Sequence, residues 1–113
     1  MSGNRFWPRA KLKQFSDKRS RATKTAKQLE RHLKGVANHR RITILFLVAR
    51  EEGINVEGIA SALQCNFKTI SEHTRRLVLA GLLEKQYAGN SVKHRLSPYG
   101  KTFLNFLNLF SNS

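Results

Sequence analysis

The stretch from Ile59 to Pro98 constrains the fold of this chain more than any other part of the sequence. It begins with a short segment whose apolar residues recur at helical spacing, and a brief polar break leads into a second helical segment that reaches about Ala80. After Gly81, which suits a sharp turn at the end of a helix, two short strand-like runs flank Gly89-Asn90. The pattern predicts two helices joined by a tight turn, followed by a β-hairpin.

Within this stretch, helix starts and strand ends can be placed by residue type. Asn55 or Val56 should open the first helix, which extends to Gln64, and Asn66 should cap the second. The residues of the second helix expected to face the core are Ile70, Leu77 and either Phe67 or Thr74. The strands are expected at Leu82 to Tyr87 and at Val92 to Leu96.

The flanking sequence favours three more helices. Residues 17–35 carry apolar side chains at near-helical spacing and end at Gly35. Asn38 is a candidate N-cap for a helix that ends at Gly53, and Ser97 with Pro98 should open the last helix. The expected order is α-α-α-α-β-β-α, a mainly α fold with one small hairpin.

The chain is strongly basic. Its 113 residues include 21 Lys and Arg against seven Asp and Glu, a formal net charge of +14. Such an excess favours polyanions without distinguishing DNA from RNA or an anionic membrane. Residues 1–27 hold nine basic side chains and one acid. We interpret residues 1–16 as a basic N-terminal arm and residues 17–113 as the folded domain; the alternative for the arm is a solvated tail that only aids solubility.

Other classes of protein are disfavoured. The longest apolar run, residues 44–49, is far short of the roughly 20 residues that span a bilayer, and no secretory signal is visible. A single cysteine excludes an internal disulfide, so we expect a cytoplasmic protein, associated with the nucleoid if DNA is its partner. The sequence has no phosphate-cradling glycine loop and no Ser-His-acid arrangement, and we expect no enzyme activity.

A set of short motifs, in order, is similar to one known family. They are Val36 to Leu45, Ile59-Ala60-x-x-Leu63, Thr69-Ile70-Ser71-x-His73, Leu77, Ala80 to Lys85, and Arg95-Leu96-Ser97-Pro98-x-Gly100. Their order and spacing resemble those of the ArsR-type winged-helix transcriptional regulators, with a MarR-like C-terminal end. The resemblance spans roughly Val36 to Gly100 and implies a winged helix-turn-helix that binds double-stranded DNA as a homodimer.

In a helix-turn-helix the second helix enters the major groove, and its exposed residues become candidate DNA contacts. Here they are Asn66, Lys68, Thr69, Ser71, Glu72, His73, Arg75 and Arg76, joined on the hairpin by Asn90, Ser91, Lys93 and Arg95. Arg75 could bind guanine through two N–H groups. Glu72 could accept a hydrogen bond from cytosine, but we favour an ion pair with Arg75 or Arg76. For His73 a structural role and a DNA contact remain open, and Lys93 and Arg95 could also be ordinary solvent-facing residues.

The last helix carries an aromatic stripe that suggests a dimer interface with the helix of residues 17–35. The candidate interface residues are Leu29, Leu33, Phe103, Phe106, Leu107 and Phe110. The alternative is that the stripe completes the core of the monomer.

We expect no metal and no other cofactor. The four histidines are scattered, and the paired cysteines that soft-metal sensors of the resembling family use are absent. Cys65 is best interpreted as a small buried hydrophobe, with redox sensing as the alternative.

These observations favour a homodimeric, sequence-specific transcriptional regulator that binds double-stranded DNA. One alternative is an architectural DNA-binding protein with little sequence preference, which the charge of +14 would also suit. The other is a winged-helix module that binds RNA or protein.

Overall fold

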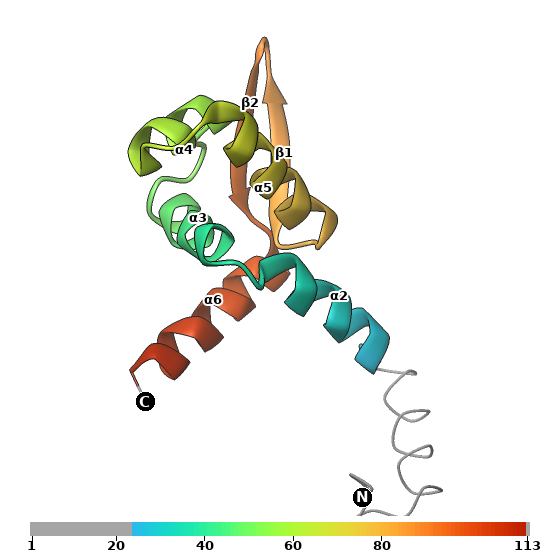
Figure 1. The fold of residues 1–113 in the computed structure, drawn as a ribbon. Coiled ribbons are helices and arrows are strands. Elements are labelled where there is room, and N and C mark those ends of the chain that lie inside the picture. Colours follow the sequence, from blue (N-terminus) through green and yellow to red (C-terminus); the bar gives the residue numbers. More distant parts are fainter. Residues whose placement is uncertain (1–23, 113) are drawn as a thin grey trace, which may run out of the picture. The chain divides into compact units, whose positions relative to one another are not determined.

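The structure is a computed structural model that describes residues 24–112 (Figure 1). The chain divides into two units between Arg31 and His32. The described part of the first unit is residues 24–31, which begin a helix, and the second unit contains the rest of the described chain. The basic arm expected at residues 1–16, and the expected domain boundary at residue 17, lie outside the described residues.

The described residues form five helices and one antiparallel hairpin in the predicted order. The elements are α2 (Ala26–Val36), α3 (His39–Arg50), α4 (Val56–Leu63), α5 (Phe67–Leu79), β1 (Leu83–Ala88), β2 (Ser91–Leu96) and α6 (Pro98–Ser111). The predicted mainly α fold class is therefore confirmed.

Polar caps explain where the helices from α3 onward begin. At each start one residue with extended backbone accepts hydrogen bonds from the N–H groups of the first turn, and a side-chain cap of this kind stabilises a helix by about 1 kcal/mol. The caps are Asn38, Asn55, Asn66 and Ser97, with Pro98 at the first position of α6. Asn38, Asn66 and Ser97 were predicted as caps from the sequence, and Asn55 was one of the two predicted starts of α4.

Left-handed residues lie at the end of α4 and in the turn after α3. Helix α4 ends one residue before the predicted Gln64, which adopts a left-handed conformation with φ of 50° and turns the chain towards α5. Helix α3 ends at Arg50, so the prediction that it continues to Gly53 was wrong. Gly53 lies in the following turn with φ of 95°, a conformation that glycine adopts without strain.

The segment after α3 runs beside the hairpin. The Gly53 N–H donates to the His94 carbonyl at 2.8 Å, and the His94 N–H donates to the Ile54 carbonyl at 3.0 Å. Ile54 and His94 form an antiparallel bridge. The loop between α3 and α4 therefore adds a short third segment to the edge of the two-stranded sheet.

The register of the hairpin determines which side chains share a face. A two-residue turn at Gly89-Asn90 pairs Ala88 with Ser91, and the pairing continues to Leu83 opposite Leu96. One face carries Leu83, Lys85, Tyr87, Val92, His94 and Leu96, and the other carries Glu84, Gln86, Lys93 and Arg95. The side chains alternate along the second strand, since His94 and Leu96 are buried and Lys93 and Arg95 are exposed.

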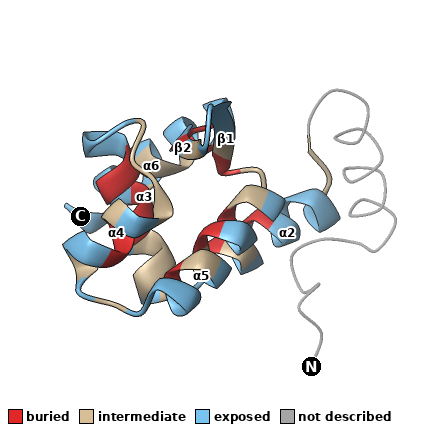
Figure 2. Cartoon of the chain, turned by 90° about the horizontal axis from the view of Figure 1, so that it is seen from above, coloured by how far each residue is buried: buried red, intermediate tan, exposed pale blue. Residues whose placement is uncertain are grey.

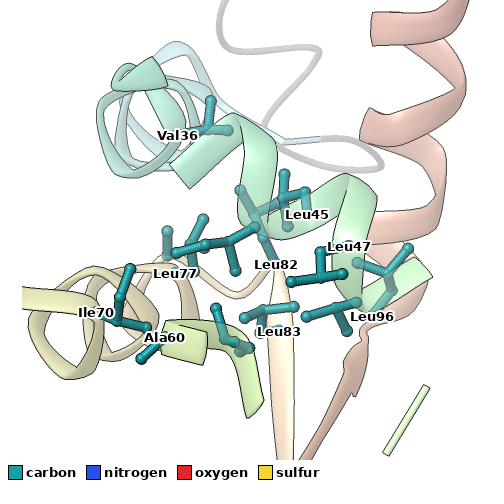
Figure 3. Packing of buried hydrophobic residues seen from close by; sticks show 13 residues of the cluster. Val36, Leu45, Leu47, Ala60, Ile70, Leu77, Leu82, Leu83 and Leu96 are labelled. Carbon is teal, nitrogen blue, oxygen red and sulfur yellow. The ribbon is translucent and has the colours of Figure 1, made fainter. Parts of the chain in front are cut away.

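The hydrophobic core forms where α3, α4 and α5 meet the base of the hairpin (Figure 3). Leu45 and Leu47 come from α3, Ala60 from α4, and Ile70 and Leu77 from α5. Leu82, Leu83 and Leu96 complete this cluster at the base of the hairpin. The core thus fixes the direction of α5 relative to the two strands.

Helix α5 buries one side and exposes the other, as the mixed burial colours along it show (Figure 2). Of the two candidates for the third inward position, Thr74 is 2% exposed and Phe67 is 53% exposed. The Thr74 hydroxyl donates to the Ile70 carbonyl at 3.0 Å, so its polar group is satisfied within the helix. Phe67 lies at the very start of α5, outside the core.

Candidate nucleic-acid interface

The first turn of α5 carries polar and basic side chains, and its backbone is held by a cap. The Asn66 side-chain oxygen accepts hydrogen bonds from the N–H groups of Lys68 at 2.7 Å and Thr69 at 3.2 Å. Since the oxygen is used in capping, only the side-chain NH₂ of Asn66 is left for another partner. The side chains of Lys68 and Thr69 are exposed.

Further along α5, an exposed face continues at helical spacing. Glu72, Arg75 and Arg76 are exposed, and Ser71 and His73 are half-buried. Residues three and four positions apart lie side by side on a helix, so Lys68, Glu72 and Arg75 follow one another along one face. This face is opposite the buried stripe of α5.

Glu72 is held between two arginines. Its carboxylate accepts hydrogen bonds from Nε and Nη2 of Arg75, at 3.1 and 2.8 Å, and from Nε of Arg76 at 2.9 Å. The bonds from Arg75, and next those from Arg76, lower the pKa of Glu72 from 4.5 to about 2. The ion pair favoured from the sequence is therefore present. Arg75 still has its Nη1 hydrogens and one on Nη2, so the outer edge of its guanidinium can bind a second acceptor.

His73 has a structural contact. Its Nδ1 accepts a hydrogen bond from Nε of Arg41 at 3.2 Å, and Arg41 also donates to the Gly35 carbonyl at 3.0 Å. Burial, and then the charges of Arg41 and Arg40, lower the pKa of His73. A neutral His73 thus connects α5 to the junction between α2 and α3. This contact supports the structural alternative without testing a DNA contact.

The outer face of the hairpin carries Lys93 and Arg95. Lys93 is exposed, and Arg95 donates from Nε to the Glu84 carboxylate across the strands at 3.0 Å. Ser91 is half-buried and Asn90 is exposed at the tip. Arg95 is one of the four hairpin residues predicted to contact DNA, and its ion pair with Glu84 partly neutralises its charge.

Two hollows join α5 to the hairpin. One is lined by Ser71 and Arg75 of α5 and by Lys85 and His94 of the strands. The other lies at the start of α5, where Phe67 is near Asn90, Ser91 and Ala88 at the hairpin tip. The exposed face of α5 and the inner face of the hairpin are thus parts of one continuous surface.

Lys85 and Phe67 belong to this surface, although neither was among the predicted contact residues. A two-residue turn at Gly89-Asn90 places Lys85 opposite His94, so the register could have identified Lys85 from the sequence. Phe67 gave no such signal, because its spacing to Ile70 equally suits a buried residue.

His94 fastens the hairpin to the core. It is 1% exposed, and its Nδ1 donates to the Ile54 carbonyl at 3.2 Å. Burial lowers the pKa of His94, which keeps the imidazole neutral in the folded protein near neutral pH. The position of Lys85 on the same face of the sheet depends on this anchor.

The candidate dimer residues are mostly accessible. Phe103 and Leu107 of α6 are partly buried against the core, whereas Phe106 and Phe110 are exposed and their rings stack with centroids 5.7 Å apart. Figure 1 shows the C-terminal half of α6 extending away from the hairpin. Leu33 is 51% exposed on α2, and Leu29, also on α2, belongs to the other unit and is 40% exposed. The core of the second unit therefore covers only part of the aromatic stripe on α6.

No group of three His, Cys, Asp or Glu side chains in residues 24–112 is arranged to hold a metal ion, and no helix in this range is long and apolar enough to cross a membrane. Cys65 is partly buried against the core, in agreement with its interpretation as a small hydrophobe.

Comparison with known proteins relates this fold to transcriptional regulators. The homodimeric winged helix-turn-helix DNA-binding domain of a possible ArsR-family transcriptional regulator from Mycobacterium bovis matches with a TM-score of 0.72 and 28% identity, over 86% of this chain and 87% of that one. The chain has the fold of the ArsR-type winged helix-turn-helix regulators. Helices α4 and α5 are its helix-turn-helix, and β1 and β2 are its wing. The resemblance predicted from the sequence is confirmed.

Two further matches establish the fold alone. Reduced HlyU from Vibrio cholerae matches with a TM-score of 0.68 and 24% identity, over 86% of this chain and 96% of its own. The transcriptional repressor PagR of Bacillus anthracis has a TM-score of 0.65 and 20% identity, over 72% and 93%. No protein-family model and no curated protein sequence gives a significant match.

Proposed function

We propose that this winged helix-turn-helix protein is a sequence-specific transcriptional regulator that binds double-stranded DNA as a homodimer. The observation that carries the proposal is the continuous surface formed by α5 and the inner face of the wing, on which Lys68, Arg75 and Lys85 are exposed. Glu72 and Glu84, the acids on α5 and on the wing, both form ion pairs with arginines. A surface of this kind suits a phosphate-rich partner.

In this proposal α5 lies in the major groove, N-terminal end first. Lys68, Thr69 and Ser71 contact phosphates, which position the helix without selecting a sequence. The outer edge of Arg75, held in place by Glu72, binds the O6 and N7 atoms of guanine. Arg76 stays with Glu72 and supports this arrangement.

The wing contacts the backbone or the minor groove of the flanking DNA. Lys93 and Arg95 on its outer face, Asn90 and Ser91 at its tip, and the newly identified Lys85 supply the contacts. Residues 1–16 act as a basic arm that adds affinity for DNA of any sequence, and residues 17–113 form the domain. Acting on DNA, the protein would be located with the nucleoid.

The proposed dimer forms through α6 together with α2. Phe106 and Phe110 of α6 are 51% and 69% exposed, and a contiguous exposed apolar patch commonly marks a surface that binds another protein. The similar Mycobacterium bovis domain is homodimeric. Two copies related by a two-fold axis would present two α5 helices to successive major grooves.

The test compares two arginines that differ in position but carry the same charge. Arg75→Ala should weaken binding to a selected duplex by about ten-fold to one-hundred-fold, as expected for a lost bidentate base contact. Arg50→Ala removes an arginine of α3 that lies off the proposed surface and pairs with Glu51, so it should have little effect. Arg75→Lys keeps the charge but loses the planar fork, and it should not restore the base preference.

Other results would favour the other functions. An architectural protein would lose similar affinity in both variants and would bind scrambled DNA as tightly as the selected duplex. Tighter binding to structured RNA, or to a protein in a manner that Arg75→Ala does not affect, would refute the DNA assignment.

A further inference from the structure

The aromatic ring of Phe67 is exposed where the fold does not require it. Phe67 is the first residue of α5 and is 53% exposed, whereas the buried stripe of this helix begins at Ile70. Among the described residues, Phe67 is outside the group of apolar side chains that pack against the core. Removing the ring should therefore change the stability of the protein little.

The surroundings of this ring combine polar, apolar and acidic side chains, and Glu57 of α4 lines the hollows on both sides of the ring. On one side a hollow brings it near Asn90 and Ser91 of the wing tip, and on the other a second hollow brings it near Ser61 and Gln64 of α4. Lys68, the next residue, is exposed. Phe67 is thus an exposed aromatic ring at the leading end of the helix, near the basic side chain of Lys68 and the acidic side chain of Glu57.

Major-groove chemistry offers one apolar group to such a ring. The groove edges of the bases carry hydrogen-bond donors and acceptors, and the C5-methyl group of thymine is the apolar exception. A side chain at the start of a helix that enters the groove lies where base edges are contacted.

We propose that Phe67 is a specificity-determining residue that packs against a thymine methyl group in each half-site of the bound DNA. This inference rests on the proposed function and extends it from phosphate and guanine contacts to selection of a T·A base pair. Since Asn66 caps the helix directly before it, the ring is presented from a fixed backbone. Burying one methyl group predicts a preference of about fourfold for thymine over a base that lacks it.

The experiment replaces single thymines by deoxyuridine, which removes the methyl group and leaves every hydrogen-bonding atom in place. A duplex selected from a random library by the full-length protein supplies the parent site. The wild-type protein should bind about fourfold more weakly when one particular thymine in a half-site is replaced. Phe67→Ala should bind the parent duplex more weakly and should not distinguish thymine from deoxyuridine at that position, while Phe67→Leu should retain part of the preference.

Two failures can be told apart. A wild-type protein that prefers its selected duplex yet binds every deoxyuridine variant equally would overturn this inference alone, as would Phe67→Ala that keeps the full thymine preference. A wild-type protein that selects no duplex would refute the proposed function, and the inference with it. The wild-type scan needs no variant, so it decides the question even if Phe67→Ala folds poorly.

Discussion

Glu72 shows how one residue can adjust both affinity and selectivity. Its carboxylate lies on the surface that we propose meets DNA, and it holds the guanidinium groups of Arg75 and Arg76. With a pKa of about 2, Glu72 stays ionised at neutral pH. In the proposed complex with DNA it therefore reduces the general attraction to phosphates and keeps Arg75 in one orientation.

Replacing Glu72 should separate these two effects. In Glu72→Gln the surface gains one unit of positive charge and Arg75 loses its charged partner. We expect tighter binding to scrambled DNA, a steeper dependence on salt, and a smaller ratio of selected to scrambled affinity. Titrations of both duplexes at several salt concentrations measure all three. Glu51→Gln makes the same change of charge beside Arg50 on α3 and should leave the ratio unaltered; an unaltered ratio in Glu72→Gln would contradict the role given to Glu72.

Burial of His94 should make the stability of the protein depend on pH. Its pKa is lowered in the folded protein by burial, from an ordinary value of 6.5. As the pH falls below about 6.5, the unfolded chain binds a proton that folded His94 resists, so the free energy of unfolding should decrease. Denaturant unfolding between pH 7.5 and 5 should show this loss, and His94→Gln should make the pH dependence shallower. An unchanged slope in His94→Gln would rule out this linkage.

At the scale of elements, Gly100 shows how closely α6 approaches the start of the wing. A Cβ atom at Gly100 would lie 2.1 Å from the Leu82 carbonyl oxygen, which itself accepts a hydrogen bond from the Ser97 N–H. The obstacle is backbone, so it cannot rotate away. The first turn of α6 is thus packed directly on the backbone between α5 and β1.

Gly100→Ala should consequently destabilise the protein, although alanine usually stabilises a helix relative to glycine. In an ordinary helix interior this change stabilises by roughly 0.5–1 kcal/mol. Here we expect a loss of about 1–3 kcal/mol in the free energy of unfolding, because the new methyl group overpacks a fixed site. Chemical denaturation measures it, with Asn105→Ala on the exposed side of α6 as the neutral comparison. A stabilised Gly100→Ala would show that α6 does not pack on Leu82 in this way.

Among the helices from α3 onward, the sequence predicted where each one begins better than where it ends. Helix starts were predictable because asparagine and serine before an apolar-periodic run have one strong use, the capping of free N–H groups. The end of α3 was not, since Gly53 is required by a turn that leads to the bridge between Ile54 and His94. That contact joins residues 40 positions apart, and no local pattern encodes it.

At the candidate site, some side-chain positions could be predicted from the sequence and others could not. The pairing of Glu72 with arginines follows from helical spacing and was predicted. The choice between Phe67 and Thr74 was not predictable, because both positions fit the helical spacing. In the structure Thr74 is buried, whereas Phe67 precedes the buried stripe of α5 and is exposed. The assignment of DNA contacts and of the dimer surface remains a prediction.

At the scale of the whole molecule, the exposed end of α6 determines the expected assembly. In Phe106→Glu combined with Phe110→Glu, two charges replace the stacked rings of the proposed interface. We expect a folded monomer, seen as a halved mass by analytical ultracentrifugation with unchanged helical content by circular dichroism, and weaker DNA binding. Tyr87→Glu alters an equally exposed aromatic residue of the wing and should leave the mass unchanged. A double variant that stays dimeric would place the interface elsewhere.

The most direct test of a homodimeric, sequence-specific regulator is selection of duplexes from a random library by the full-length protein at about 150 mM salt, followed by titration of the selected duplex against scrambled DNA and RNA. We predict a palindromic site with half-sites spaced near one helical turn, bound at least ~10³-fold more tightly than scrambled DNA. The absence of an enriched sequence, with tight binding only at low salt, would contradict this account and indicate an architectural protein.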